Sequence, residues 1–122
     1  MNKKMSMNMT FHVKVPKLNN LSSNVRNRLQ EELRSSAILL TNEVKESING
    51  ARAEPRSFKT GNFLNSVAFI EAPLMFTVYS DVEYAGFLEY GTTSMEAREH
   101  FRNSLMRMRP DIIQKLNNAV RV

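Results

Sequence analysis

Few side chains in this sequence have the types and spacing that metal binding requires. His12 and His100 are the only histidines, and the chain contains no cysteine. Glu96, Glu99 and His100 lie close together in the sequence, but without the histidine spacing of a zinc-binding helix. Thiol chemistry and cysteine-ligated metals are therefore excluded, and we expect no metal site. His100 is instead expected at the surface or at an interface.

The carboxylates offer one candidate for acid–base chemistry. Asp81 and Glu83 are close enough in sequence to act as a pair, but Ser80 and Glu83 also have the spacing of a helix capping box. The four glycines lack the spacing of a phosphate-binding loop, and no serine has the G-x-S-x-G context of a nucleophile. An enzyme that uses Asp81, Glu83, Glu89 and His100 is our least favoured hypothesis, and we expect no catalytic residue and no cofactor.

The composition favours one small basic domain. The 122 residues are 42% apolar, which is enough for one modest core. Polar residues 1–9 predict a flexible arm, and residues 10–122 a single domain. The net charge of +5 suits an acidic partner, but the basic residues are scattered, so a small basic DNA-binding module is the alternative hypothesis. No stretch has the length of a membrane anchor or the pattern of a secretion signal.

The first part of the chain predicts a strand followed by a long helix. Apolar residues alternate over residues 10–15, which is typical of a half-buried strand, and Pro16 ends the pattern. Apolar residues then recur every three or four positions, which predicts one amphipathic helix of about seven turns. Ser22 or Ser23 is its expected cap, and Asn49 with Gly50 its expected end. The apolar stripe consists of Val25, Leu29, Leu33, Ala37, Leu40, Val44 and Ile48, widened by Ile38 and Leu39.

A long loop and a hairpin are expected next. Residues 50–61 contain two glycines, a proline and three basic residues, which predicts a loop. Thr60 is the expected cap of a short helix that follows this loop. The β-branched and aromatic residues over 67–72 and 74–80 predict two adjacent antiparallel strands separated by Pro73.

The remaining sequence predicts two helices and completes the fold class. A short helix over residues 82–90 is expected to end at Gly91. A helical period continues over residues 101–120, where Pro110 either kinks one helix or starts a second one. The order of elements predicts an α+β fold with a small antiparallel β-sheet packed against one long helix and a C-terminal helix.

Three segments in this order resemble the neck proteins of tailed bacteriophages, which are the tail-completion or head–tail joining proteins. The segments are P-x-x-x-K-T-G-N-F-L-N-S-V at 55–67, V-E-Y-A-G-F-L-E-Y-G-T at 82–92 and A-R-E-H-F-R-N-S-L at 97–105. Lys59 and His100 differ from the aspartate and the proline that this family often has there. The matching positions are Thr60, Gly61, Leu64, Ser66, Tyr84, Ala85, Glu89, Gly91, Thr92 and Phe101.

The resemblance implies a structural virion protein with no enzymatic activity. Such a protein would form a ring, with a hexamer favoured and a dodecamer as the other option, through which packaged DNA passes without specific binding. Its partners would be other neck, connector or tail terminator proteins. The protein would lie in the neck or tail of the virion, and in the host cytoplasm during assembly. The resemblance leaves open whether the protein completes the tail, closes the head or joins the two.

A ring subunit needs two complementary lateral faces, and buried aromatic side chains commonly form such contacts. Phe87, Tyr90 and Phe101 exceed what a short helix needs for its own packing. The monomer core is slightly favoured for Phe87 and a subunit contact for Tyr90, while Glu89 is expected to reach an arginine of a neighbouring subunit. The predicted interface set is Arg52, Arg56, Lys59, Phe87, Glu89, Tyr90, Thr92 and Phe101.

Overall fold

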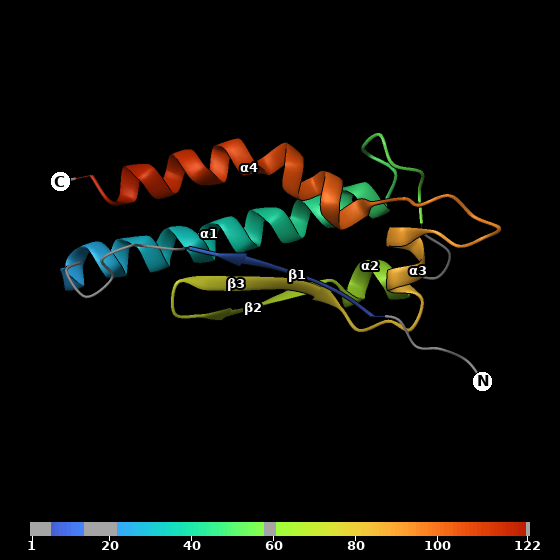
Figure 1. Ribbon diagram of the computed structural model, residues 1–122, viewed down its shortest axis with the longest axis horizontal. Helices are drawn as coiled ribbons and strands as arrows, with labels where there is room; N and C mark the ends of the chain where they lie inside the picture. The colour runs from blue at the N-terminus through green and yellow to red at the C-terminus, as the bar shows by residue number, and fades with distance from the viewer. Residues whose placement is uncertain (1–5, 14–21, 58–60, 122) are drawn as a thin grey trace.

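The computed structural model describes residues 6–13, 22–57 and 61–121. The elements in these residues are β1 (Met7–His12), α1 (Ser23–Ile48), α2 (Asn62–Ser66), β2 (Ala68–Ala72), β3 (Met75–Ser80), α3 (Ala85–Tyr90) and α4 (His100–Ala119). In Figure 1, α1 lies between α4 and the sheet, and α2 and α3 lie together at one end of the molecule. The α+β fold that the sequence predicts is confirmed.

The three strands form one antiparallel sheet in the order β1-β3-β2. β2 and β3 form the predicted hairpin around Pro73. β1 begins at Met7, earlier than predicted, so residues 7–9 belong to the sheet and not to a flexible arm. The reason is that Met7 and Met9 continue the apolar alternation of Phe11, which stacks on Phe76 with ring centroids 5.4 Å apart. Residues 1–5 and 14–15 lie outside the described residues.

The predicted long helix is confirmed as α1. Ser22 is its cap, and its hydroxyl accepts a hydrogen bond from the backbone N–H of Val25 at 3.2 Å. Asn49 ends it, as predicted. Leu29, Leu33, Ala37, Leu40, Val44 and Ile48 form the buried stripe. Ile38 and Leu39 do not widen this stripe, because each side chain is at least partly exposed to solvent.

The C-terminal segment forms one helix, α4, with Pro110 inside it. Proline has no backbone N–H and its ring crowds the preceding turn, so it kinks a helix. In Figure 1 the first turns of α4 run at an angle to the rest. Phe101, Ile112 and Leu116 pack the helix against α1 in the common core.

The helix predicted over residues 82–90 is shorter, because α3 begins at Ala85. The predicted capping box is wrong: Ser80 is the last residue of β3, and its hydroxyl lies 2.6 Å from Ser66 Oγ and accepts from the N–H of Val82 at 3.3 Å. The alternation of β3 continues through Ser80, which is fully buried. Sheet pairing therefore decides the conformation of this serine.

Gly91 ends α3, as predicted, with a φ of 79°. A Cβ atom at this position would lie 2.7 Å from the backbone nitrogen of Ala97 and 2.9 Å from the carbonyl oxygen of Met95. Glycine is required here for both its backbone conformation and the close approach of the next loop. This approach brings the start of α4 next to α3.

Candidate functional site

The end of α1, the loop after it and the start of α4 meet around a cluster of polar side chains, of which Glu43, Ser47, Glu54 and His100 are buried. We call this group, Glu43, Ser47, Glu54, Ser57, His100, Asn103 and Arg107, the polar junction. The N–H of Ser57 donates to the carbonyl of Ile48 at 2.8 Å, which folds the loop back onto the end of α1. His100 is the first residue of α4 and is 0% exposed. The predicted surface or interface position of His100 is therefore wrong.

One directional chain of hydrogen bonds runs through the polar junction. Ser47 Oγ donates a short hydrogen bond to Glu54 Oε1. Because a serine hydroxyl has only one proton, Ser47 Oγ must accept from His100 Nδ1, 2.8 Å away. Nε2 of a neutral His100 then accepts from Ser57 Oγ at 2.7 Å, and Arg98 Nη1 donates to the same Ser57 oxygen at 2.9 Å. The donors all point along one path toward the carboxylate of Glu54.

Arginine side chains complete the charge balance around Glu54. Arg107 donates to both of its carboxylate oxygens, each at 2.9 Å, and also reaches Glu43 at 2.8 Å. Arg52 binds Glu43 with two hydrogen bonds, at 2.7 and 2.9 Å. Burial alone would raise the pKa of Glu54, but hydrogen bonds from Arg107, Ser47 and Asn103 outweigh it and lower the pKa to about 2.

Burial has the opposite effect on the imidazole. Loss of hydration disfavours the charged ring and lowers the pKa of His100 to about 4, against the attraction of Glu54 and with the repulsion of Arg98 and Arg107. His100 is thus neutral at physiological pH, which is the state that the hydrogen-bond chain requires.

The lowered pKa of His100 predicts a loss of stability in mild acid. The unfolded chain binds a proton near the usual histidine pKa of about 6.5, while the folded chain does so only near 4. The contribution is therefore fully present above about pH 6.5 and declines as the pH falls toward 4. We expect the free energy of unfolding, measured with urea, to fall by about 2 kcal/mol between about pH 7 and pH 5.

Two features make that measurement specific. The carboxylate of Glu54 adds little in this pH window, since its pKa is low when folded and near the ordinary carboxylate value of about 4.3 when unfolded. A His100→Gln variant provides the control, because its stability should not decline over the same window: the raised pKa of Glu89 acts in the opposite direction. An equal decline in both proteins would show that His100 is not the cause.

Glu89 joins α3 to the start of α4. Its Oε1 accepts from the N–H of Phe101 at 2.8 Å, and its Oε2 from the N–H of Arg102 at 3.0 Å. The first N–H groups of a helix have no partner inside the helix, and the N-cap residue Glu99 makes no side-chain cap. Glu89 therefore caps α4 from a different helix. Burial raises the pKa of its carboxyl group, although the two backbone donors oppose this.

Two predicted interface residues are corrected by these contacts. Glu89 is 2% exposed and cannot reach an arginine of a neighbouring subunit, because both of its oxygens bind the chain's own backbone. Phe101 is 0% exposed and belongs to the core. Both residues position α4, and neither is available at the surface.

The other predicted interface residues lie around the same end of the molecule. Tyr90 is 62% exposed, Thr92 and Arg56 are exposed, and Phe87 is half-buried. Arg52 is exposed but pairs with Glu43 of its own chain. Lys59 lies outside the described residues. A subunit contact through the exposed residues stays a prediction.

The residues matched to the phage family have structural roles in the described chain. Gly61 precedes α2 with a φ of 82°, and Leu64 packs against the core. Ser66 Oγ donates to the carbonyl of Phe63 at 2.7 Å. Ala85 is fully buried, while the ring of Tyr84 lies edge-on to that of Phe63. The predicted cap of α2 is wrong, because Gly61 and not Thr60 is its N-cap, and Thr60 lies outside the described residues.

A hollow of about 720 Å³ lies beside the polar junction. Ser57 and Arg98 belong to its wall, and the rest of the lining is mainly apolar: Phe63, Tyr84, Phe87, Leu88 and Met95. The hydrogen bond from Ser57 to His100 is also the arrangement in which a histidine base activates a serine nucleophile. Here, however, a serine and not a carboxylate orients His100 Nδ1. We therefore assign the polar junction the role of fastening the loop to α1 and α4.

The sequence interpretation missed the residues of the polar junction except His100. One signal was present: His100, Ser104 and Arg107 recur at helical spacing beside the apolar period of Phe101 and Leu105. Side chains at this spacing share one face of the helix. Nothing in the sequence spacing indicates that Glu54, in a loop, would be the carboxylate at its centre.

Comparison with family models, with curated proteins and with solved structures finds no match. Across the described parts of the chain, no group of His, Cys, Asp or Glu side chains is arranged to hold a metal ion. A separate search of those residues finds no helix with the length and apolar character needed to cross a membrane.

Proposed function

We propose that this protein is a structural virion protein of a tailed phage that forms a ring at the joint between head and tail. The observation that carries the proposal is that the three segments resembling phage neck proteins meet at one place. Arg98, in the third segment, donates its backbone N–H to the carbonyl of Leu88 in the second at 2.8 Å. Its side chain donates to the carbonyl of Arg56 in the first at 2.9 Å.

The contacts among these segments support a structural role for the shared residues. Glu89 and Gly91 of the second segment fix where α4 begins. Ser57 of the first segment is tied to His100 of the third. Contacts between residues that are far apart in sequence thus fix the structure at this end of the molecule. A surface that is already held in one shape lowers the entropy cost of a subunit contact.

Tyr90 is the candidate contact residue on this end. It follows Glu89 on α3, and its 62% exposed side chain contributes little to the monomer core. Large exposed aromatic side chains are favoured at the centres of protein contacts. No observation of comparable kind favours the DNA-binding alternative, because Arg34, Arg52, Arg102 and Arg107 are each paired with a carboxylate of the same chain.

Replacing Tyr90 by aspartate should abolish ring assembly and leave the monomer folded. An aspartate cannot fill an apolar contact and would be desolvated in it, which costs about 2 kcal/mol or more per contact, or roughly 30-fold in the association constant. Native mass spectrometry and negative-stain images measure assembly, and circular dichroism measures folding.

The matched control is Tyr90→Phe, which keeps the aromatic surface and should assemble. If Tyr90→Asp forms rings as stable as those of the wild-type chain, Tyr90 is not part of the subunit contact. If Tyr90→Asp unfolds the monomer instead, the tyrosine belongs to the core and the proposed contact is wrong.

A further inference from the structure

The sheet has two free edges. β3 is paired on both sides, so β1 and β2 each keep one edge without a partner strand among the described residues. β1 pairs with β3 in an unbroken register from Met7 to His12, without a bulge. Its sequence MNMTFH contains no lysine, acidic residue or proline. Edge strands are usually protected by such features, and β1 has none of them.

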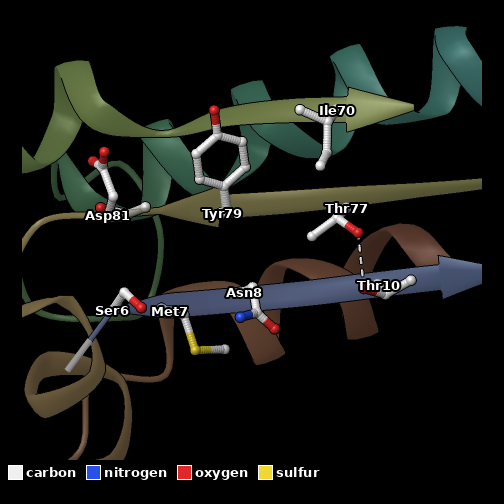
Figure 2. A pocket seen from close by; sticks show the side chains of 9 residues that line it. Ser6, Met7, Asn8, Thr10, Ile70, Thr77, Tyr79 and Asp81 are labelled. Carbon is white, nitrogen blue, oxygen red and sulfur yellow. Dashed lines mark hydrogen bonds between the residues drawn. The ribbon is translucent and has the colours of Figure 1, made fainter. Parts of the chain in front are cut away.

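The face of the sheet that points away from α1 has no charged side chain on its strands. Residues on this face are Asn8, Thr10, His12, Ala68, Ile70, Ala72, Met75, Thr77 and Tyr79, as the pairing register sets them. Ile70 is 60% exposed. Figure 2 shows Ile70, Tyr79 and the hydrogen-bonded pair Thr10 and Thr77 along a shallow hollow of about 450 Å³.

The charge distribution makes this face suitable for contact with another copy of the chain. Each copy has a net charge of +5, so two copies repel wherever their cationic surfaces meet. Arginine and lysine are absent from β1, β2 and β3. The charged residue of these strands, Glu71, lies on the other face and pairs with Arg34. Two copies can therefore approach along the sheet without bringing cations together.

We propose that the free edge of β1 pairs with the free edge of β2 in the next copy, so that the sheets of neighbouring subunits become continuous. This inference rests on the proposed ring function and names the surface that forms the ring. β1 and β2 run in the same direction, because both are antiparallel to β3. The new pairing is therefore parallel, and main-chain hydrogen bonds supply its affinity.

Such pairing is head to tail and can close by rotation. Each copy offers one β1 edge and one β2 edge, so every contact uses two different surfaces, as a ring requires. If β1 paired with β1 of another copy, the contact would join two identical edges and assembly would stop at a dimer. α3 contacts β1, which places Tyr90 on an element next to the proposed β1 contact.

The absence of cysteine from the chain allows a direct test with engineered disulfides. The double variant Thr10→Cys with Ile70→Cys places one thiol at the middle of each free edge. Within one copy β3 separates these positions, so they are two strand spacings, about 10 Å, apart, which is too far for a disulfide. Only a contact between copies can join them. Asn8→Cys and His12→Cys, each with Ile70→Cys, cover the neighbouring registers.

We expect at least one of these double variants to give a ladder of covalent oligomers on oxidation, ending at the ring size. Thr10→Cys alone and Ile70→Cys alone should remain monomeric on a denaturing gel. Thr10→Cys with Asn117→Cys is the matched control, because Asn117 is exposed on α4 and belongs to neither sheet edge, and it should give no ladder.

The outcomes separate this inference from the proposed function. A covalent dimer from Thr10→Cys alone would show β1–β1 pairing and overturn the proposal. Rings seen by native mass spectrometry, with no ladder from any of the three double variants, would also overturn it while leaving the ring function intact. Absence of both rings and ladders would contradict the two together.

Discussion

Replacing Glu54 by alanine is expected to lower the free energy of unfolding by about 2–4 kcal/mol, because several hydrogen-bond donors lose a buried carboxylate acceptor. The side chain of Glu54 is 3% exposed and accepts hydrogen bonds from Arg107, Ser47 and Asn103. Its removal leaves the Ser47 hydroxyl and the Asn103 amide without this acceptor, and Arg107 keeps only its contact with Glu43. Urea unfolding at neutral pH measures the change.

A double-mutant cycle shows how much of this effect belongs to the Glu54–Arg107 pair. Arg107→Ala and the double variant complete the cycle, and we expect a coupling energy of about 1–3 kcal/mol. Glu31→Ala, which removes an exposed carboxylate of α1, should change stability by less than about 0.5 kcal/mol. A Glu54→Ala variant as stable as Glu31→Ala would mean that the polar junction does not hold the loop.

The second large effect is expected at Glu89. Alanine at this position leaves the N–H groups of Phe101 and Arg102 without an acceptor, and the first of these is buried. Loss of a helix cap typically costs about 0.5–2 kcal/mol, and an unsatisfied buried donor about 1–3 kcal/mol. Part of this is offset because the carboxylate no longer has to be desolvated, so we expect a net loss of about 2–4 kcal/mol.

Hydrogen exchange locates the effect of Glu89→Ala. The amide protons in the first turn of α4 should exchange faster, while those in the middle of α1 change only as far as global stability requires. Glu89→Gln retains one acceptor oxygen and should be intermediate. Glu96→Ala, at an exposed loop carboxylate, is the matched control. Unchanged protection at Phe101 in Glu89→Ala would show that this side chain does not cap α4.

The sequence predicts the framework of this fold well because the framework depends on periodic patterns. The apolar stripe of α1, the alternation in β2 and β3, and the glycine at the end of α3 each act through local geometry. The start of β1 is the exception, because its methionines lie in a stretch whose composition predicts a flexible arm. Their alternation with polar residues was the signal that favoured a strand.

The site was harder to predict, because its residues act through contacts distant in sequence. In the sequence, Glu89 lies among aromatic residues, a pattern that also fits an exposed subunit contact. It is buried because the chain turns at Gly91 and packs the start of α4 against it. Likewise, His100 becomes buried because the loop after α1 folds back over it and provides Ser57. The sequence contains the donors and acceptors, but their pairing depends on the tertiary fold.

The mass of the assembled protein tests the central claim most directly. Native mass spectrometry of the wild-type chain, alone and mixed with portal, adaptor and tail-tube proteins of a tailed phage, should show a closed ring of one stoichiometry, with a hexamer expected. A chain that stays monomeric at every concentration, and also in the presence of those proteins, would contradict the proposal that it is a ring-forming protein of the phage neck.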